Sequence, residues 1–193
     1  MGDWFNSLVD PVVDEKGAEE LCDATIVRFR DLGLITGELD AEYVLGGKGY
    51  RPGPALHDFV DDQGMLPSPF QLRVEPQIGR HFNAYAIGPN FLHLTCPACA
   101  ARFDDIRGVL LEQIGDGFSN WMERGEFTDV DCPRCGKATA VNGWECKPPI
   151  GFGNRAFTFW NWPHFDSPGW RIDLRKIVSD VTGHPTVYTW GKI

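Results

Sequence analysis

Two cysteine pairs are the residues of this sequence best suited to chemistry. Residues 96–99 read Cys-Pro-Ala-Cys, and residues 132–135 read Cys-Pro-Arg-Cys. A Cys-x-x-Cys turn directs both sulfurs toward one small volume, and two such turns supply the four soft thiolates that tetrahedral zinc prefers. The spacing therefore predicts a zinc site with four ligands: Cys96, Cys99, Cys132 and Cys135.

The ligand set indicates what such an ion does. Four protein ligands close the coordination sphere, whereas a catalytic zinc keeps one position for water. We therefore expect a structural Zn²⁺ that contributes to folding. Cys-x-x-Cys pairs also occur as redox dithiols, in which one cysteine lies at the start of a helix. The matched second pair favours metal binding over this redox alternative.

Three further side chains have weaker links to the site. Cys146 lies 11 residues after Cys135 and is a candidate spare ligand, although four ligands already complete the site. His93 precedes Cys96 by three residues and either supports the site from outside or packs on a strand. Cys22 falls on the apolar side of an expected helix, which favours a buried thiol.

Short extended segments are expected to carry both pairs. Residues 81–87 and 91–95 predict two strands of a hairpin joined by the Gly-Pro-Asn turn at 88–90, and this hairpin delivers the first pair. The second pair lies between extended segments at 126–131 and 137–144. Short extended segments therefore flank both pairs.

The connection between the pairs predicts a helix. Apolar residues recur at helical spacing over 106–122. Asp104 or Asp105 is expected to cap its start, while Gly115 and Gly117 are expected to kink or split it.

Over about residues 91–145 this arrangement resembles a zinc ribbon, in which each Cys-x-x-Cys lies at the tip of a hairpin. The resemblance implies a metal module and no particular activity. The helix in the connection departs from a minimal ribbon. No resemblance extends over the whole chain.

The other segments indicate an α+β fold. Helical periodicity predicts helices over 14–32 and 173–181. Alternation predicts a half-exposed strand over 70–74, and large apolar groups on both faces predict a buried central strand over 156–163. A last strand is expected over 185–190.

Two N-terminal segments are harder to interpret. Residues 4–13 are too apolar for a free tail, so we expect them to pack on the body, with Pro11 breaking any continuous helix. Residues 43–45 predict a short strand. The glycine-rich segment 46–54 lacks the Walker pattern, since no serine or threonine follows Lys48, and is expected to be a bent loop.

We therefore expect an α+β protein with a mixed or antiparallel sheet, packed helices and a zinc-ribbon-like module woven into its second half. Its 193 residues fit either two parts, 1–88 and 89–193, or one compact domain over 1–193.

The charge favours some partners over others. The formal net charge is −9, and four thiolates around a dication add about −2. Such a chain is repelled by nucleic-acid phosphates unless its basic residues cluster, and it suits a basic protein partner. No apolar run approaches the roughly 18–20 residues of a membrane span, and the N-terminus lacks the features of a signal peptide. A soluble cytoplasmic protein is expected.

An aromatic segment before the last helix offers a second candidate surface. The candidates for a ligand-binding or partner-binding surface are Trp160, Trp162, His164 and Asp166. The alternative is core packing with polar tips facing solvent. A base-stacking platform would need flanking basic residues, and only Arg155 and Arg171 lie close in sequence.

These observations predict a non-enzymatic zinc-binding protein that acts as a protein-interaction or regulatory module. The five histidines are scattered, so no catalytic set converges in the sequence. A hydrolase or transferase that uses zinc only structurally is the first alternative. A nucleic-acid-binding ribbon is the second.

Overall fold

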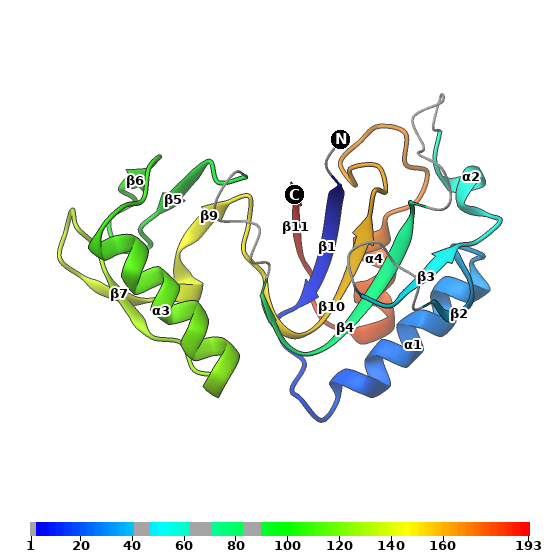
Figure 1. Ribbon diagram of the computed structural model, residues 1–193, viewed down its shortest axis with the longest axis horizontal. Helices are drawn as coiled ribbons and strands as arrows, with labels where there is room; N and C mark the ends of the chain where they lie inside the picture. The colour runs from blue at the N-terminus through cyan, green and yellow to red at the C-terminus, as the bar shows by residue number, and fades with distance from the viewer. Residues whose placement is uncertain (1–2, 41–46, 62–70, 83–89) are drawn as a thin grey trace.

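The computed structural model describes residues 3–40, 47–61, 71–82 and 90–193. It confirms an α+β fold, with one sheet of six strands, one of three and one of two. Figure 1 shows the six-stranded sheet with α1 and α4 on one side of the molecule, and the smaller sheets with α3 on the other. None of the described helices has the length and apolar character needed to cross a membrane.

The six-stranded sheet has the order β11-β1-β10-β4-β3-β2, and its described pairings are antiparallel. Its strands are β1 (Trp4–Asp10), β2 (Ile35–Asp40), β3 (Gly49–Pro52), β4 (Arg73–Phe82), β10 (Phe152–Trp160) and β11 (Val187–Lys192). The expected buried strand is confirmed as β10, which lies between β1 and β4 near the centre of the sheet. The predicted last strand is confirmed as β11.

In the large sheet, β1, β2 and β3 form where the sequence predicted no strand. β1 is buried along most of its length, because apolar residues on both faces suit a strand inside a sheet. β3 replaces the expected bent loop. Gly49 permits its close approach to β4, since a Cβ there would lie 3.2 Å from the Cβ of Arg73. The strand predicted over 43–45 lies outside the described residues.

Helices α1 (Ala18–Asp31) and α4 (Leu174–Thr182) contact each other and pack with α2 (Leu56–Phe59) around the first hydrophobic core. Phe29 of α1 meets Phe157 and Phe159 of β10 edge to face. Both α1 and α4 were predicted from the sequence. Asp173 caps α4 by accepting hydrogen bonds from two backbone amides, and Gly183 ends it with a φ of +71°.

A second core lies around the cysteines, in what we call the cysteine lobe (residues 90–150). Its elements are β5 (His93–Thr95), β6 (Arg102–Phe103), α3 (Val109–Arg124), β7 (Asp129–Asp131), β8 (Ala138–Ala140), a 3₁₀ turn (Val141–Gly143) and β9 (Glu145–Lys147). Phe82 of β4 and Phe152 of β10 pack into this second core, so two strands of the large sheet extend into both cores.

The predicted hairpin of 81–87 with 91–95 is not seen in the described residues. β5 pairs with β6 and β9, while His81 belongs to β4 and pairs with Gly153. Residues 83–89, which include the expected domain boundary near residue 88, lie outside the described ranges. The six-stranded sheet takes strands from both sides of that position.

The helix between the cysteine pairs differs from the prediction at two points. α3 begins after Gly108, whereas Asp104 and Asp105 form ion pairs with neighbouring arginines. It continues unbroken through both glycines. A Cβ at Gly117 would lie 3.0 Å from the side chain of Val141, so this glycine provides room for packing and does not kink the helix.

Candidate metal centre

The first cysteine pair lies in the tight turn that joins β5 to β6. The Cys96 amide donates to the carbonyl of Ala101 at 2.9 Å, and the Ala100 amide donates to the carbonyl of Cys96 at 2.9 Å. The Ala98 amide also donates to the Cys96 sulfur at 3.3 Å. The two backbone bonds close the turn, and the Ala98 amide orients the sulfur of Cys96.

The second pair repeats this turn between β7 and β8. The Cys132 amide donates to the carbonyl of Lys137 at 3.0 Å, and the Gly136 amide donates to the carbonyl of Cys132 at 2.8 Å. The Arg134 amide donates to the Cys132 sulfur at 3.4 Å. Gly136 has a φ of +69°, and the residue at the equivalent place in the first turn, Ala100, has a φ of +57°. Two hairpins thus present matching Cys-x-x-Cys turns.

The turns bring the four cysteines together. The sulfurs of Cys96, Cys99, Cys132 and Cys135 all lie within 4.8 Å of one another. The Cys99 and Cys132 sulfurs are 3.8 Å apart. A tetrahedron with metal–sulfur bonds of about 2.3 Å has edges of about 3.8 Å, so this spacing is compatible with a bound metal ion.

Burial divides the cluster into two halves. Cys96 and Cys132, the first cysteine of each turn, are buried at 1% exposure, while Cys99 and Cys135 are exposed. The cluster therefore lies between the second core and the surface. A bound ion would therefore have two buried and two exposed sulfur ligands.

Local hydrogen bonds shift the thiol pKa values in opposite directions. Burial acts to raise the pKa of Cys132, but the amides of Cys135 and Arg134, together with neighbouring thiols, lower that pKa to about 7. The Ala101 amide acts to lower the pKa of Cys99, but desolvation and three neighbouring thiols raise it to about 12. The amide donors thus favour at Cys132 the thiolate that binds metal.

Side chains behind the turns fix how the two hairpins meet. Gln113 of α3 accepts a hydrogen bond from the Asp131 amide at 3.0 Å, which attaches β7 to the helix. Trp144 donates through Nε1 to the Thr139 carbonyl at 3.4 Å, and its ring lies 6.2 Å from that of Phe103. Trp144 therefore contacts both hairpins.

The other sulfur and nitrogen candidates lie outside the cluster. In the described part of the chain, the only group with metal-ligand spacing is the set of four cysteines. Cys146 is buried opposite Leu94, and burial raises its pKa to about 12. Cys22 is likewise buried, as predicted, and burial raises its pKa to about 11. The Nδ1 atom of His93 is buried and has no hydrogen-bond partner among the described residues.

The aromatic candidates occupy different environments. Trp160 and Trp162 are buried at 5% and 2% exposure. His164 and Asp166 are partly exposed on the loop that follows β10, where Asp166 binds Arg175 at 2.8 Å. Asp166, together with aromatic and arginine side chains, lines a surface pocket of about 440 Å³. Of these four residues, His164 and Asp166 on the loop are therefore the ones that a partner could contact.

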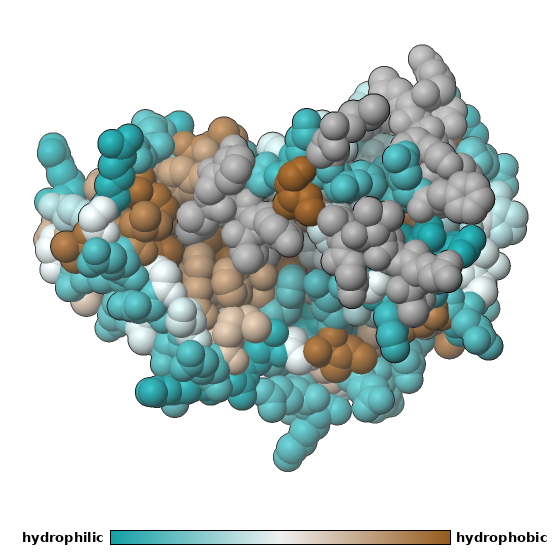
Figure 2. Space-filling view, in the orientation of Figure 1, coloured by the Kyte–Doolittle hydropathy of each residue, from teal (hydrophilic) through white to brown (hydrophobic). Residues whose placement is uncertain are grey.

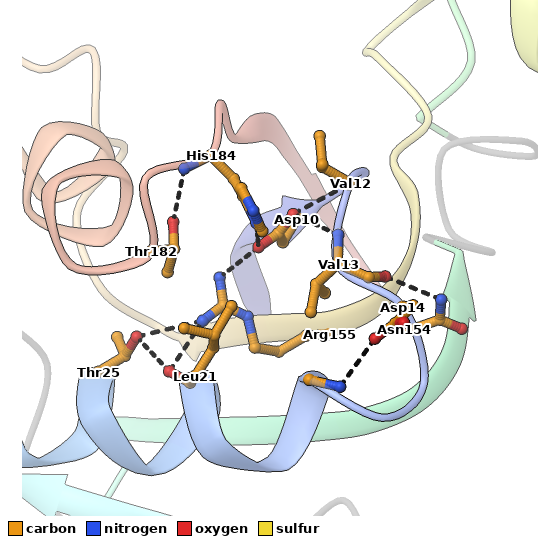
Figure 3. A network of polar contacts seen from close by, with 11 residues as sticks. Asp10, Val12, Val13, Asp14, Leu21, Thr25, Asn154, Arg155, Thr182 and His184 are labelled. Carbon is orange, nitrogen blue, oxygen red and sulfur yellow. Dashed lines mark hydrogen bonds and ion pairs between the residues drawn. The ribbon is translucent and has the colours of Figure 1, made fainter.

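Sequence reasoning missed a buried polar network, shown in Figure 3. Arg155 of β10 forms an ion pair with Asp10 of β1 at 2.8 Å, and both side chains are 1% exposed. Asp10 also contacts Nδ1 of His184 at 2.9 Å, and Arg155 donates to the carbonyl of Leu21 in α1 at 2.9 Å. Burial lowers the pKa of Arg155, while Asp10 acts to raise it. In the sequence, the sign of this network is one arginine, Arg155, among the apolar residues of a central strand.

Fold and site together define an α+β protein with a four-cysteine cluster that is compatible with a metal centre. The chain matches no protein-family model, no curated protein and no solved structure.

Proposed function

We propose that this chain is a zinc-binding protein in which Cys96, Cys99, Cys132 and Cys135 hold one structural Zn²⁺ in a zinc-ribbon-like module. The observation that carries the proposal is the approach of all four sulfurs to within 4.8 Å, two from each matching turn. Four thiolates in tetrahedral geometry are typical of zinc, and also of iron. Zinc is the better assignment for a closed site with a folding role.

The surrounding lobe explains why an ion is needed. Its strands are two or three residues long, and its core holds fewer buried side chains than the large sheet does. Strands this short have few hydrogen bonds to hold them. A bound zinc ion would contribute several kcal/mol of folding free energy by joining the β5–β6 turn to the β7–β8 turn.

The biological role that fits this architecture is binding of a protein partner in the cytoplasm. None of the six cysteines is in a disulfide, which suits a reducing compartment. A closed ligand set leaves the ion no position for substrate. The net charge of −9 disfavours nucleic acid and suits a basic partner.

Metal analysis tests the zinc assignment. We expect about one zinc per chain in purified protein, and Cys132→Ser to lose that zinc and to unfold more easily. Cys146→Ser is the matched control, because Cys146 is also buried in the same lobe but lies outside the cluster. Iron in place of zinc, or a metal-free protein that cycles between dithiol and disulfide, would contradict the assignment.

A further inference from the structure

The large sheet has two edges, β2 and β11, and they differ in how they meet solvent. The pairing of β2 with β3 is interrupted between Thr36 and Asp40. Gly37, in this interruption, has a φ of +73°, and its carbonyl accepts a hydrogen bond from Arg30 at 3.2 Å. Irregular, charged edges of this kind hinder the addition of another strand.

The β11 edge is regular. Its residues Val187 to Lys192 pair with β1 without a bulge. The amide of Ile193 donates to the carbonyl of Asp3 at 2.9 Å, so Ile193 and Asp3 are a hydrogen-bonded pair of the two strands. Because hydrogen-bonded pairs alternate along antiparallel strands, the backbone groups of Tyr188, Trp190 and Lys192 point away from β1.

One of these three outward positions already has a partner. Oδ1 of Asn90 accepts from the Lys192 amide, and Nδ2 of Asn90 donates to the Lys192 carbonyl, each at 2.9 Å. The amide side chain thus imitates the N–H and C=O of a neighbouring strand. Within the described part of the chain, the outward backbone groups of Tyr188 and Trp190 have no such partner.

An aromatic shelf, formed by His164, Tyr188 and Trp190, lies beside these backbone groups. The His164 ring meets Tyr188 and Trp190 edge to face, at centroid distances of 5.4 and 5.0 Å. Asp166 lies next to the shelf, and its side chain is 54% exposed. One of its carboxylate oxygens pairs with Arg175 at 2.8 Å, and the other lies 3.9 Å from Nδ1 of His164. The edge therefore offers main-chain hydrogen bonds, apolar contact and a carboxylate together.

We propose that β11 accepts an extended segment of a partner protein as a seventh strand of the sheet. Tyr188 and Trp190 pair with its backbone, its apolar side chains lie on the aromatic shelf, and its basic side chains lie near Asp166. This inference rests on the proposed protein-binding function and assigns it a location. Two copies of this chain would each bring a charge of −9, so a basic partner is favoured over self-association.

Calorimetry with a capped hexapeptide of alternating valine and lysine, at about 0.15 M salt, tests the proposal. We expect the peptide to bind, and the same peptide with every amide N-methylated to bind at least tenfold more weakly, because it keeps the charges but loses its donors. Trp190→Pro removes an outward N–H without a bond to β1, so we expect a tenfold or greater loss. Trp190→Ala keeps that N–H and is expected to lose less.

Amide hydrogen exchange supplies a readout that needs no variant. At saturating peptide we expect exchange at Tyr188 and Trp190 to slow at least tenfold, while exchange at Glu38, on the opposite edge, stays unchanged.

The proposal would be overturned by no binding of the peptide, by equal binding of the N-methylated peptide, or by a dimer in sedimentation that Trp190→Pro dissociates. Full peptide binding by Trp190→Pro would also reject the β11 location, yet leave a protein-binding role intact. Zinc content is measured independently of all these outcomes.

Discussion

At the scale of single residues, the ion pair between Asp10 and Arg155 places two charges in the protein interior. Both side chains are fully buried, and Arg155 also donates to the carbonyl of Leu21. Removing two charges from water is costly, and the pair is tolerated because each partner neutralises the other and accepts or donates further hydrogen bonds. Loss of one partner should therefore be far more damaging than loss of a surface ion pair.

Asp10→Asn is expected to lower the free energy of unfolding by about 3 kcal/mol, because Arg155 keeps a buried charge without a counter-ion. Urea denaturation measures this difference. The matched control is Asp180→Asn, which removes an exposed ion pair with Lys176 and should cost no more than about 0.5 kcal/mol. Similar losses in the two variants would contradict a special role for the buried pair.

His81 makes stability depend on pH. Burial lowers the pKa of His81 from 6.5 to about 4, and its Nε2 atom has no partner among the described residues. Between these two pH values the unfolded chain binds a proton at His81 and the folded chain does not, so the free energy of unfolding falls as pH falls. In His81→Phe this dependence should be shallower. An unchanged slope of stability against pH would reject the role of His81.

At the scale of elements, the two cysteine turns are built alike but reach the left-handed backbone region with different residues. Gly136 adopts it at φ +69° and Ala100 at φ +57°. A Cβ at Gly136 would meet nothing within 4 Å, so only the backbone conformation opposes a side chain there. The first turn already bears the cost that a Cβ adds in this region.

Gly136→Ala is therefore expected to lower the unfolding free energy of the zinc-loaded protein by about 1 kcal/mol. Ala100→Gly should change it less, because relief of the left-handed strain is offset by greater freedom of the unfolded chain. Thermal unfolding of both variants with equal zinc content provides the comparison. A loss in Ala100→Gly as large as in Gly136→Ala would show that the turns are not equivalent.

At the scale of the whole molecule, two hydrophobic cores share the strands β4 and β10. The core of the large sheet takes residues from both ends of the chain, whereas the core of the cysteine lobe lies largely within residues 94–152. Figure 2 shows apolar surface gathered over the cysteine lobe on the face in view. Because the metal-binding residues belong to one core, removal of the ion should affect the two cores unequally.

A chelator should therefore unfold the cysteine lobe first. After zinc removal we expect amides of β5 and β7 to exchange rapidly, while amides of β1 and the Phe157 end of β10 keep their protection. Hydrogen exchange before and after chelation measures this difference. Equal loss of protection in both cores would show that the ion holds the whole fold together.

The parts of the fold that sequence reasoning predicted are those with local signals. Helix periodicity located α1 and α4, and Cys-x-x-Cys spacing located the four clustered cysteines. The strand β1 was missed because its role depends on β10 and β11, which lie about 150 and about 180 residues away in sequence. The same reason explains the Asp10–Arg155 pair and the pairing of β5 with β9. Contacts between distant strands leave little trace in either strand alone.

X-ray absorption at the zinc edge tests the central claim most directly. For protein purified with zinc, a structural site made by Cys96, Cys99, Cys132 and Cys135 predicts four sulfur neighbours at about 2.3 Å and no nitrogen or oxygen neighbour. Three sulfurs with one nitrogen or oxygen neighbour would indicate an open or differently ligated site. That result, or a spectrum without bound zinc, would contradict a closed structural metal centre.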